Sequence, residues 1–444
     1  MMAKLYAGFS RRDITPEEYT TLAGFGNDDY RLCNNIIDRV YGTCVAIRDE
    51  EGNTLLLCTV DLLNAVKPTV VDGARQAINE ATGVPEDHIM VSVTHTHAGP
   101  SMYSWEDERT CRFLKHYCKQ MAKAAREAIE DLHEAEIHVG QKIVKNMTFV
   151  RHYLMNDGTV AGAGFGSWKS GVKAHMDVSD DQLQVMRFVR KDARDIVLVN
   201  WQSHATITSA GTRLDMSADY PGAMRNHVEG ITGCHCAFYQ GACGNLVPSS
   251  SRKEEMIVEH DHILYGQKLA EFVIECLNEN MRPVQAGPIK TIQYTYTGTI
   301  DHTEDHRVPD AEKVTIGFFD KEVAERNALL KQYGFNSYLH ANQIRNRARM
   351  GATLDMELDV VSIGDIAFAT APYEMFNSNG RFVKDNSPFE LTFMMAYCNG
   401  SNSYIADEKA FGYDCYEVNS RRFPKGAAEE IAATHVKLLH QLKD

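Results

Sequence analysis

Histidine, glutamate and tyrosine residues follow four apolar runs in this sequence, and all three residue types can bind a metal. The first run leads into Thr94-His95-Thr96-His97-Ala98-Gly99-Pro100, and the second ends in Asn200-Trp201-Gln202-Ser203-His204. The third is followed by Glu374 and the fourth by Tyr404. Two imidazoles, a carboxylate and an oxygen donor suit zinc and leave a position for water. If these segments converge, they could support hydrolysis by a metal-activated water.

Each of these residues, taken alone, also has a structural interpretation. His95 and His97 are two residues apart, which places both imidazoles on one side if the strand continues, but polar histidines packed in a turn fit equally well. His204 fits a hydrogen-bonded structural residue, and Glu374 fits a carboxylate favoured by a helix N-terminus. Tyr404 fits a packing residue. The metal-site hypothesis therefore depends on all four segments meeting in space.

Strands and helices are mixed along the chain that must position these residues. The sequence predicts two hairpins, pairing 41–48 with 54–61 and 183–189 with 196–201, from β-rich runs around polar turns. Hydrophobic periodicity adds strands at 89–93, 237–240, 356–363, 366–370 and 391–397, and helices at 67–81, 111–132, 220–230, 257–280, 320–350 and from about 426. The pattern predicts a mixed α/β fold with one or two mixed sheets flanked by helices.

Composition narrows the class of protein further. The chain has 444 residues, 44% hydrophobic and 24% charged, with a formal net charge of −14. This charge disfavours nucleic acid and anionic membrane surfaces as partners. The 11 cysteines fit reduced core thiols better than a disulfide framework. With no evident linker, signal segment or membrane anchor, we expect one domain over 1–444, a cytoplasmic location and a small-molecule substrate. The oligomeric state stays open.

The four segments together resemble the zinc-site motifs of the neutral and alkaline, non-lysosomal ceramidases, and they occur in that family's order. The most specific element is Thr-His-Thr-His-x-Gly-Pro at 94–100. The resemblance extends from about Gly8 to the region of Tyr416, which covers nearly the whole chain. It implies the fold of the family's N-terminal catalytic domain, without the further C-terminal β domain of the ceramidases.

By position, the resemblance implies that His95, His204, Glu374 and Tyr404 bind zinc as the cofactor. It also implies that His97 stands beside the metal and assists proton transfer or hydrogen bonding.

Two further residues take roles from the resemblance. Tyr416 lies twelve residues after Tyr404, which matches a family tyrosine that hydrogen-bonds the scissile carbonyl, so we expect it to stabilise an oxyanion. A packed tyrosine in a C-terminal loop is the alternative. Asp219 resembles a family aspartate after the second histidine and is expected to orient a ligand. A simple acid at a helix N-terminus is the alternative for Asp219.

The sequence departs from the family at two places that concern substrate. Val247 occupies the position, before Pro248, of a serine assigned to the family's active site. Met147 replaces a frequent family arginine, although Arg151 lies four residues on and offers a comparable charge. The resemblance therefore implies that the metal-binding residues are kept, while residues expected to contact the substrate have changed.

These observations predict a zinc-dependent hydrolase that cleaves a linear amide (N-acyl) bond of a soluble small molecule other than ceramide. Two alternatives remain. One is a zinc-dependent esterase or deacetylase acting on a sugar-like substrate. The other is a non-catalytic, zinc-stabilised ligand-binding protein, which the loss of the serine at Val247 would allow.

Overall fold

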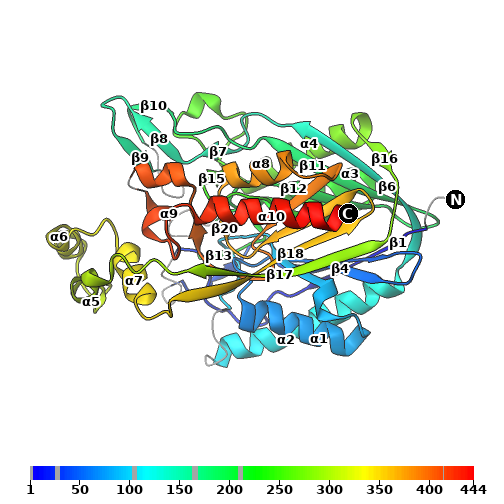
Figure 1. The fold of residues 1–444 in the computed structure, drawn as a ribbon, viewed down its shortest axis with the longest axis horizontal. Helices are drawn as coiled ribbons and strands as arrows, with labels where there is room; N and C mark the ends of the chain where they lie inside the picture. Colours follow the sequence, from blue (N-terminus) through cyan, green and yellow to red (C-terminus); the bar gives the residue numbers. More distant parts are fainter. Residues whose placement is uncertain (1–3, 26–30, 103–107, 163–168, 209–213, 414) are drawn as a thin grey trace.

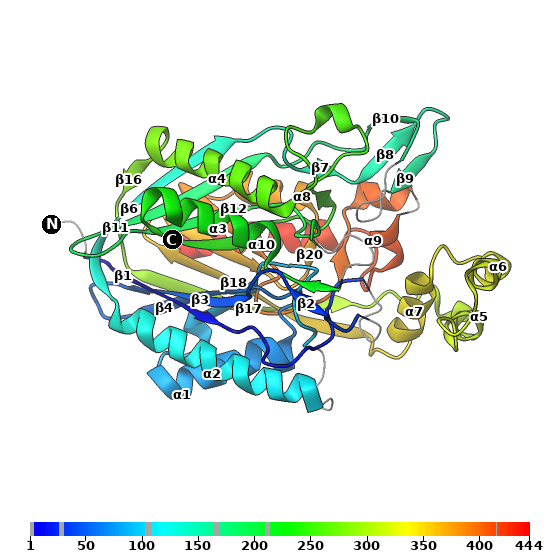
Figure 2. The same ribbon diagram turned by 180° about the vertical axis from the view of Figure 1, so that it is seen from behind.

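The computed structural model describes residues 4–25, 31–102, 108–162, 169–208, 214–413 and 415–444. The fold is mixed α/β, as predicted, with a larger and a smaller sheet between outer helices (Figures 1 and 2).

The larger sheet has nine strands and is mostly antiparallel. Its order is β14 (His235–Gln240), β12 (Ile196–Trp201), β11 (Gln182–Arg190), β6 (His133–Ile143), β1 (Tyr6–Asp13), β3 (Tyr41–Arg48), β4 (Thr54–Val60) and β5 (Ile89–Val93), with β16 (Arg282–Val284) also paired to β6. Parallel pairs occur at both ends of this order, β12 with β14 and β4 with β5. Both predicted hairpins are confirmed.

The smaller sheet has four strands and contains one parallel pair. Its order is β17 (Ile289–Thr299), β18 (Thr353–Ile363), β19 (Ile366–Ala371) and β21 (Leu391–Ala396). The pair β19–β21 is parallel. Short strands form separate two-stranded pairs: β7 (Phe149–Val150) pairs with β15 (Leu246–Val247), and β20 (Glu374–Met375) pairs with β22 (Tyr404–Ile405).

Strands that are buried on both faces explain the nearly continuous apolar runs in the sequence. In β3, Val45 and Ile47 face a core shared by the two sheets, whereas Cys44 and Ala46 face the core beneath the helices. Successive side chains of a strand point to opposite faces, so a strand between two cores needs apolar residues at every position.

Helices cover the outer faces. The helices α1 (Asp72–Thr82) and α2 (Glu108–Glu130) pack on the core that contains Cys44 and Ala46. The helices α3 (Asp219–Thr232) and α4 (His262–Glu279) pack on β11, β12 and β14. The smaller sheet is covered by α8 (Asn377–Asp385) and α10 (Ala427–Lys443) (Figure 1). The helix α4 starts later than the expected 257, because Asp261 caps it by accepting from the backbone N–H groups of Ile263 and Leu264.

A helical lobe projects from one end of the molecule, where the sequence predicted one long helical pattern over 320–350. It contains α5 (Val308–Thr315), α6 (Val323–Tyr333) and α7 (Tyr338–Arg347) (Figure 1). Gly334 ends α6 in a left-handed conformation with φ of 65°, and the Ser337 hydroxyl caps α7. A cap residue that favours left-handed φ interrupts a helix even where the hydrophobic pattern continues.

The two ends of the larger sheet fold toward each other, and this brings distant segments together. The Tyr239 hydroxyl on β14 donates to the Leu57 carbonyl on β4, 3.0 Å away. Beyond the strands, Thr96 and Ala205 form a parallel bridge. Within the described residues, no helix combines the length and apolar character needed to cross a bilayer.

Candidate metal centre

His95 and His97 lie in the loop that follows β5, at the carboxyl end of that strand. The strand ends at Val93, as the predicted range 89–93 has it, and His95 has φ of 60°, so the condition that the strand continues through both histidines is not met. The loop nevertheless brings the two imidazoles together, with their Nε2 atoms 3.2 Å apart. The His97 backbone N–H donates to the Ala205 carbonyl at 3.0 Å, next to His204.

His204 follows β12 and completes a cluster of three buried histidines. One ring nitrogen from each of His95, His97 and His204 lies within 4.8 Å of the other two. His95 Nδ1 lies 2.7 Å from the Leu63 carbonyl oxygen, and His204 Nδ1 lies 2.8 Å from the Leu246 carbonyl oxygen. A carbonyl oxygen can only accept, so these contacts place the proton on Nδ1 and leave Nε2 as an electron-pair donor.

Glu374 lies opposite these two Nε2 atoms, in the short strand β20. Its Oε2 is 3.5 Å from His95 Nε2 and 3.3 Å from His204 Nε2, and it accepts a hydrogen bond of 3.3 Å from the Tyr397 hydroxyl. Glu374 therefore does not lie at a helix N-terminus, which was its structural alternative.

The electrostatics of the cluster favour a bound cation. Burial lowers the pKa of His204 to about 4 and holds the pKa of His97 well below its usual range. Burial acts to raise the pKa of Glu374, but His95 and His204 outweigh it and keep that pKa well below its usual range. At neutral pH the ionised Glu374 carboxylate thus faces the uncharged imidazole of His204, and zinc accepts carboxylate and imidazole donors.

Tyr404 lies directly beside Glu374, because β22 pairs with β20 at these two residues. Its ring is edge-on to that of Tyr416, with ring centroids 5.4 Å apart. Tyr416 begins the short helix α9 (Tyr416–Asn419) and is 39% exposed. Burial raises the pKa of Tyr416 to about 12, so its hydroxyl keeps its proton at neutral pH.

Arg151 connects this site to a second buried cluster. Its guanidinium carbon lies 5.4 Å from the Tyr404 ring centroid and 6.0 Å from that of Tyr416. Its Nε donates to Glu417 Oε1 at 2.5 Å, and His152 Nε2 lies 2.8 Å from Glu417 Oε2. Arg151, His152, Glu417 and the neighbouring Cys415 are called the arginine cluster below.

The two remaining predicted residues lie behind the histidines. The Asp219 carboxylate accepts from the backbone N–H groups of Thr208 and Tyr220, which fastens the segment after His204 to the start of α3. Asp219 thus acts on the backbone around His204 through these contacts. Val247 lies in β15 beside Leu246, whose carbonyl orients His204, and is 5% exposed.

Sequence reasoning missed several residues that shape the site. Tyr397 stacks on His95 with ring centroids 3.8 Å apart, whereas the sequence pattern predicts it only as the end of a strand. Gly24 has φ of 136°, and a Cβ there would lie 2.7 Å from His97 Nδ1. Arg31 donates to the His97 carbonyl at 3.1 Å. No local spacing links Gly24 or Arg31 to His97, whereas Glu417 could have been flagged as the neighbour of Tyr416.

Comparisons with known proteins bear on the fold. No protein-family model and no curated protein sequence matches the chain. The structure of the neutral ceramidase from Pseudomonas aeruginosa matches with a TM-score of 0.70 and 18% sequence identity, covering 99% of this chain and 74% of the ceramidase chain. A ceramidase complexed with C2 matches with a TM-score of 0.70 and 16% identity, covering 99% and 75% respectively. This protein therefore has a ceramidase-like fold, as the sequence resemblance predicted.

Proposed function

We propose that this protein is a zinc-dependent hydrolase that cleaves the N-acyl amide bond of a soluble small molecule. The observation that carries the proposal is the position of the ionised Glu374 carboxylate, within 3.5 Å of the electron-pair-donating Nε2 atoms of both His95 and His204. These three residues come from three different strand ends. Strand ends are where α/β folds place their ligand sites.

The proposed zinc ligands are His95, His204, Glu374 and Tyr404. The imidazole and carboxylate donors fit zinc, and backbone carbonyls already hold the two histidines in the tautomer that presents Nε2. When bound, zinc supplies a Lewis acid and lowers the pKa of water to about 7.

His97 is the proposed proton carrier. Its Nε2 is 3.2 Å from His95 Nε2, and the backbone of Gly24 packs against its ring. Because His95 Nε2 carries no hydrogen, this contact places the hydrogen of an uncharged His97 on its Nε2, from which it can pass to the leaving amine.

Tyr416 is the proposed donor to the scissile carbonyl oxygen. Its hydroxyl keeps its proton at neutral pH, and its ring lies edge-on to that of Tyr404, with centroids 5.4 Å apart. A hydrogen bond that strengthens as charge develops on the oxygen accelerates the reaction.

Two observations support the amide assignment and a change of substrate. The matched solved proteins are named as ceramidases, and ceramide carries an N-acyl amide. The buried Val247 stands in place of the family serine, which favours a substrate other than ceramide. Turnover of an amide and an ester that carry the same acyl group shows which bond is cleaved. Activity on the ester alone would support the esterase alternative.

The metal is tested by its content in protein purified without added metal. We expect about one zinc per chain in the wild type, and loss of that zinc in His95→Ala and His204→Ala. His133→Ala, a half-exposed histidine at the start of β6, is the control and should keep its metal. A wild type that holds no metal and cannot be loaded would refute the proposal.

Catalysis is separated from binding by Tyr416→Phe. We expect kcat to fall by about 100-fold while zinc content and KM stay close to wild type, because the lost hydrogen bond acts in the transition state. Unchanged turnover would refute this role of Tyr416, whereas a zinc-loaded wild type that binds ligand without any turnover would favour the non-catalytic binding protein.

A further inference from the structure

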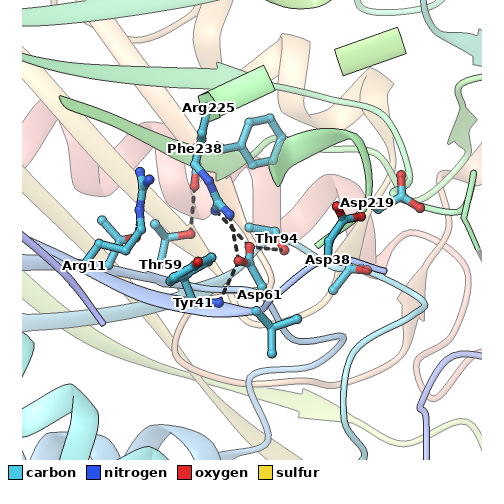
Figure 3. Close-up of polar contacts among 12 residues, drawn as sticks. Arg11, Asp38, Tyr41, Thr59, Asp61, Thr94, Asp219, Arg225 and Phe238 are labelled. Atoms are coloured by element: carbon cyan, nitrogen blue, oxygen red, sulfur yellow. Dashed lines mark hydrogen bonds and ion pairs between the residues drawn. The ribbon is translucent and has the colours of Figure 1, made fainter. Parts of the chain in front are cut away.

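A fully buried ion pair joins Asp61, just after β4, to Arg225 on α3 (Figure 3). Arg225 Nη1 donates to Asp61 Oδ1 at 2.8 Å, and Nη2 donates to Oδ2 at 2.7 Å. The Arg225 side chain is 2% exposed and the Asp61 side chain 0%. Such a two-pronged contact fixes both the distance and the direction between its partners.

Asp61 lies at the centre of the segments that hold His95. Its carboxylate also accepts from the backbone N–H of Tyr41 at 2.9 Å and from the hydroxyl of Thr94 at 3.3 Å (Figure 3). Thr94 immediately precedes His95. Two residues beyond Asp61, the Leu63 carbonyl receives the hydrogen bond from His95 Nδ1. A shift of Asp61 therefore moves both the backbone and the ring contact of His95.

Arg225 lies on the helix that holds His204. The helix α3 begins at Asp219, which binds the backbone of Thr208, and the Tyr220 hydroxyl donates to the Ser203 carbonyl at 2.6 Å. Ser203 immediately precedes His204. A shift of α3 therefore moves the segment that carries His204.

The pair thus links the two halves of the candidate site. The strands that lead to His95 and His204 lie near opposite ends of the larger sheet's strand order, and they meet because the sheet folds over. Beside the pair, the Thr59 hydroxyl on β4 donates to the Phe238 carbonyl on β14 at 2.7 Å (Figure 3). The nearby Arg11 guanidinium pairs with Glu229 at 3.0 Å, so it has its own acid.

We propose that Asp61 and Arg225 are a positioning pair that sets the separation of His95 and His204 and thereby the affinity for the metal. This inference rests on the proposed metal site. Stability alone explains the pair poorly, because apolar residues of similar volume often replace buried ion pairs without loss. A fixed separation between two metal ligands, in contrast, depends on the directional fork.

The test measures zinc affinity against a chromophoric chelator, with the visible spectrum of cobalt-loaded protein as a second readout. We expect Arg225→Met to weaken zinc binding by about 10- to 100-fold, the usual effect of losing an outer contact to a metal ligand. Arg225→Lys, which keeps the charge but not the fork, should recover part of that loss.

The double variant Asp61→Asn/Arg225→Met separates positioning from charge burial. It removes both charges, so its unfolding transition should lie close to that of the wild type, while its zinc affinity stays low and its cobalt spectrum stays altered. If Arg225→Met fails to fold, the double variant still allows the zinc affinity to be measured. Arg190→Met is the matched control, since Arg190, at the end of β11, is a buried arginine paired with Asp131, which lies between α2 and β6. It should lose stability and keep its zinc affinity.

Wild-type zinc affinity and cobalt spectrum in the double variant would overturn the positioning role and leave the proposed function intact. A wild-type protein that binds no metal would instead refute the proposed function, and the inference with it.

Discussion

Two buried clusters in this protein combine histidine with glutamate, and they differ in what balances the carboxylate. In the candidate metal centre, Glu374 faces the Nε2 atoms of His95 and His204. In the arginine cluster, Glu417 accepts from the Arg151 guanidinium at 2.5 Å. The ligand atoms of His152, Cys415 and Glu417 also lie within 4.8 Å of one another, so proximity alone does not separate the two clusters.

Hydrogen bonding separates them. In the candidate metal centre, His95 and His204 each bond a backbone carbonyl through Nδ1, and their Nε2 atoms face Glu374. In the arginine cluster, His152 Nε2 bonds Glu417, and His152 Nδ1 lies 3.4 Å from the Tyr413 hydroxyl. Within the described residues, the Arg151 guanidinium contacts the Glu417 carboxylate directly, whereas the contacts given above for Glu374 are with two imidazoles and the Tyr397 hydroxyl. A buried carboxylate without a directly bonded cationic side chain favours a bound metal ion.

Neutralising each glutamate in turn is the strongest test of this difference between the two clusters. We expect Glu374→Gln to lose zinc and to lower activity at least about 10,000-fold, equivalent to about 5 kcal/mol of transition-state stabilisation. Glu417→Gln should keep its zinc. Metal analysis and turnover of an N-acyl substrate measure both effects. Retention of zinc in Glu374→Gln, or its loss in Glu417→Gln alone, would reverse our assignment of the clusters.

Removing the arginine tests its role as the resident cation. Arg151→Met leaves Glu417 buried without its counter-charge, so we expect the free energy of unfolding to fall by about 3–5 kcal/mol. Denaturant unfolding measures it. Combining Arg151→Met with Glu417→Leu should recover most of this loss, because no uncompensated charge remains. An additive, more severe loss in the double variant would contradict the charge-balance argument.

Metal removal should act on one cluster only. With free zinc at about 100 times its dissociation constant, the bound metal should add about 2.7 kcal/mol to stability, so a chelator should lower Tm by several degrees. Glu417→Gln should show the same chelator-dependent shift as the wild type. Glu374→Gln should show none, and a full shift in that variant would place the metal elsewhere.

The smallest expected effect concerns acid stability. Burial acts to raise the pKa of Glu417, but Arg151 and His152 hold it well below its usual range. The unfolded chain therefore binds the proton first, and this stabilisation is present above pH of about 4.3 and lost as pH falls below it. We expect the loss to be about 1.4 kcal/mol per pH unit in the wild type relative to Glu417→Gln. Parallel stability curves for the two proteins would refute this.

Local chemistry in the sequence determined where elements begin and end. The apolar runs and the polar turn between 48 and 54 predicted the hairpin of β3 and β4, and the stripe over 111–132 predicted α2, which spans Glu108–Glu130. The polar residues that follow the strands also mark the candidate site in the sequence. These signals depend on near neighbours in the chain, so the sequence carries them directly.

The tertiary structure alone decided how the site is assembled. His95 and His204 follow strands near opposite ends of the sheet order, and only the folded sheet brings their loops into contact. Glu374 follows β19 of the smaller sheet and faces both histidines. Arg151 donates to Glu417, which lies 266 residues further along the chain. Residues so far apart leave no periodic pattern. Their pairing follows from the packing of whole sheets and helices, which is settled by the buried area and charge balance of the complete fold.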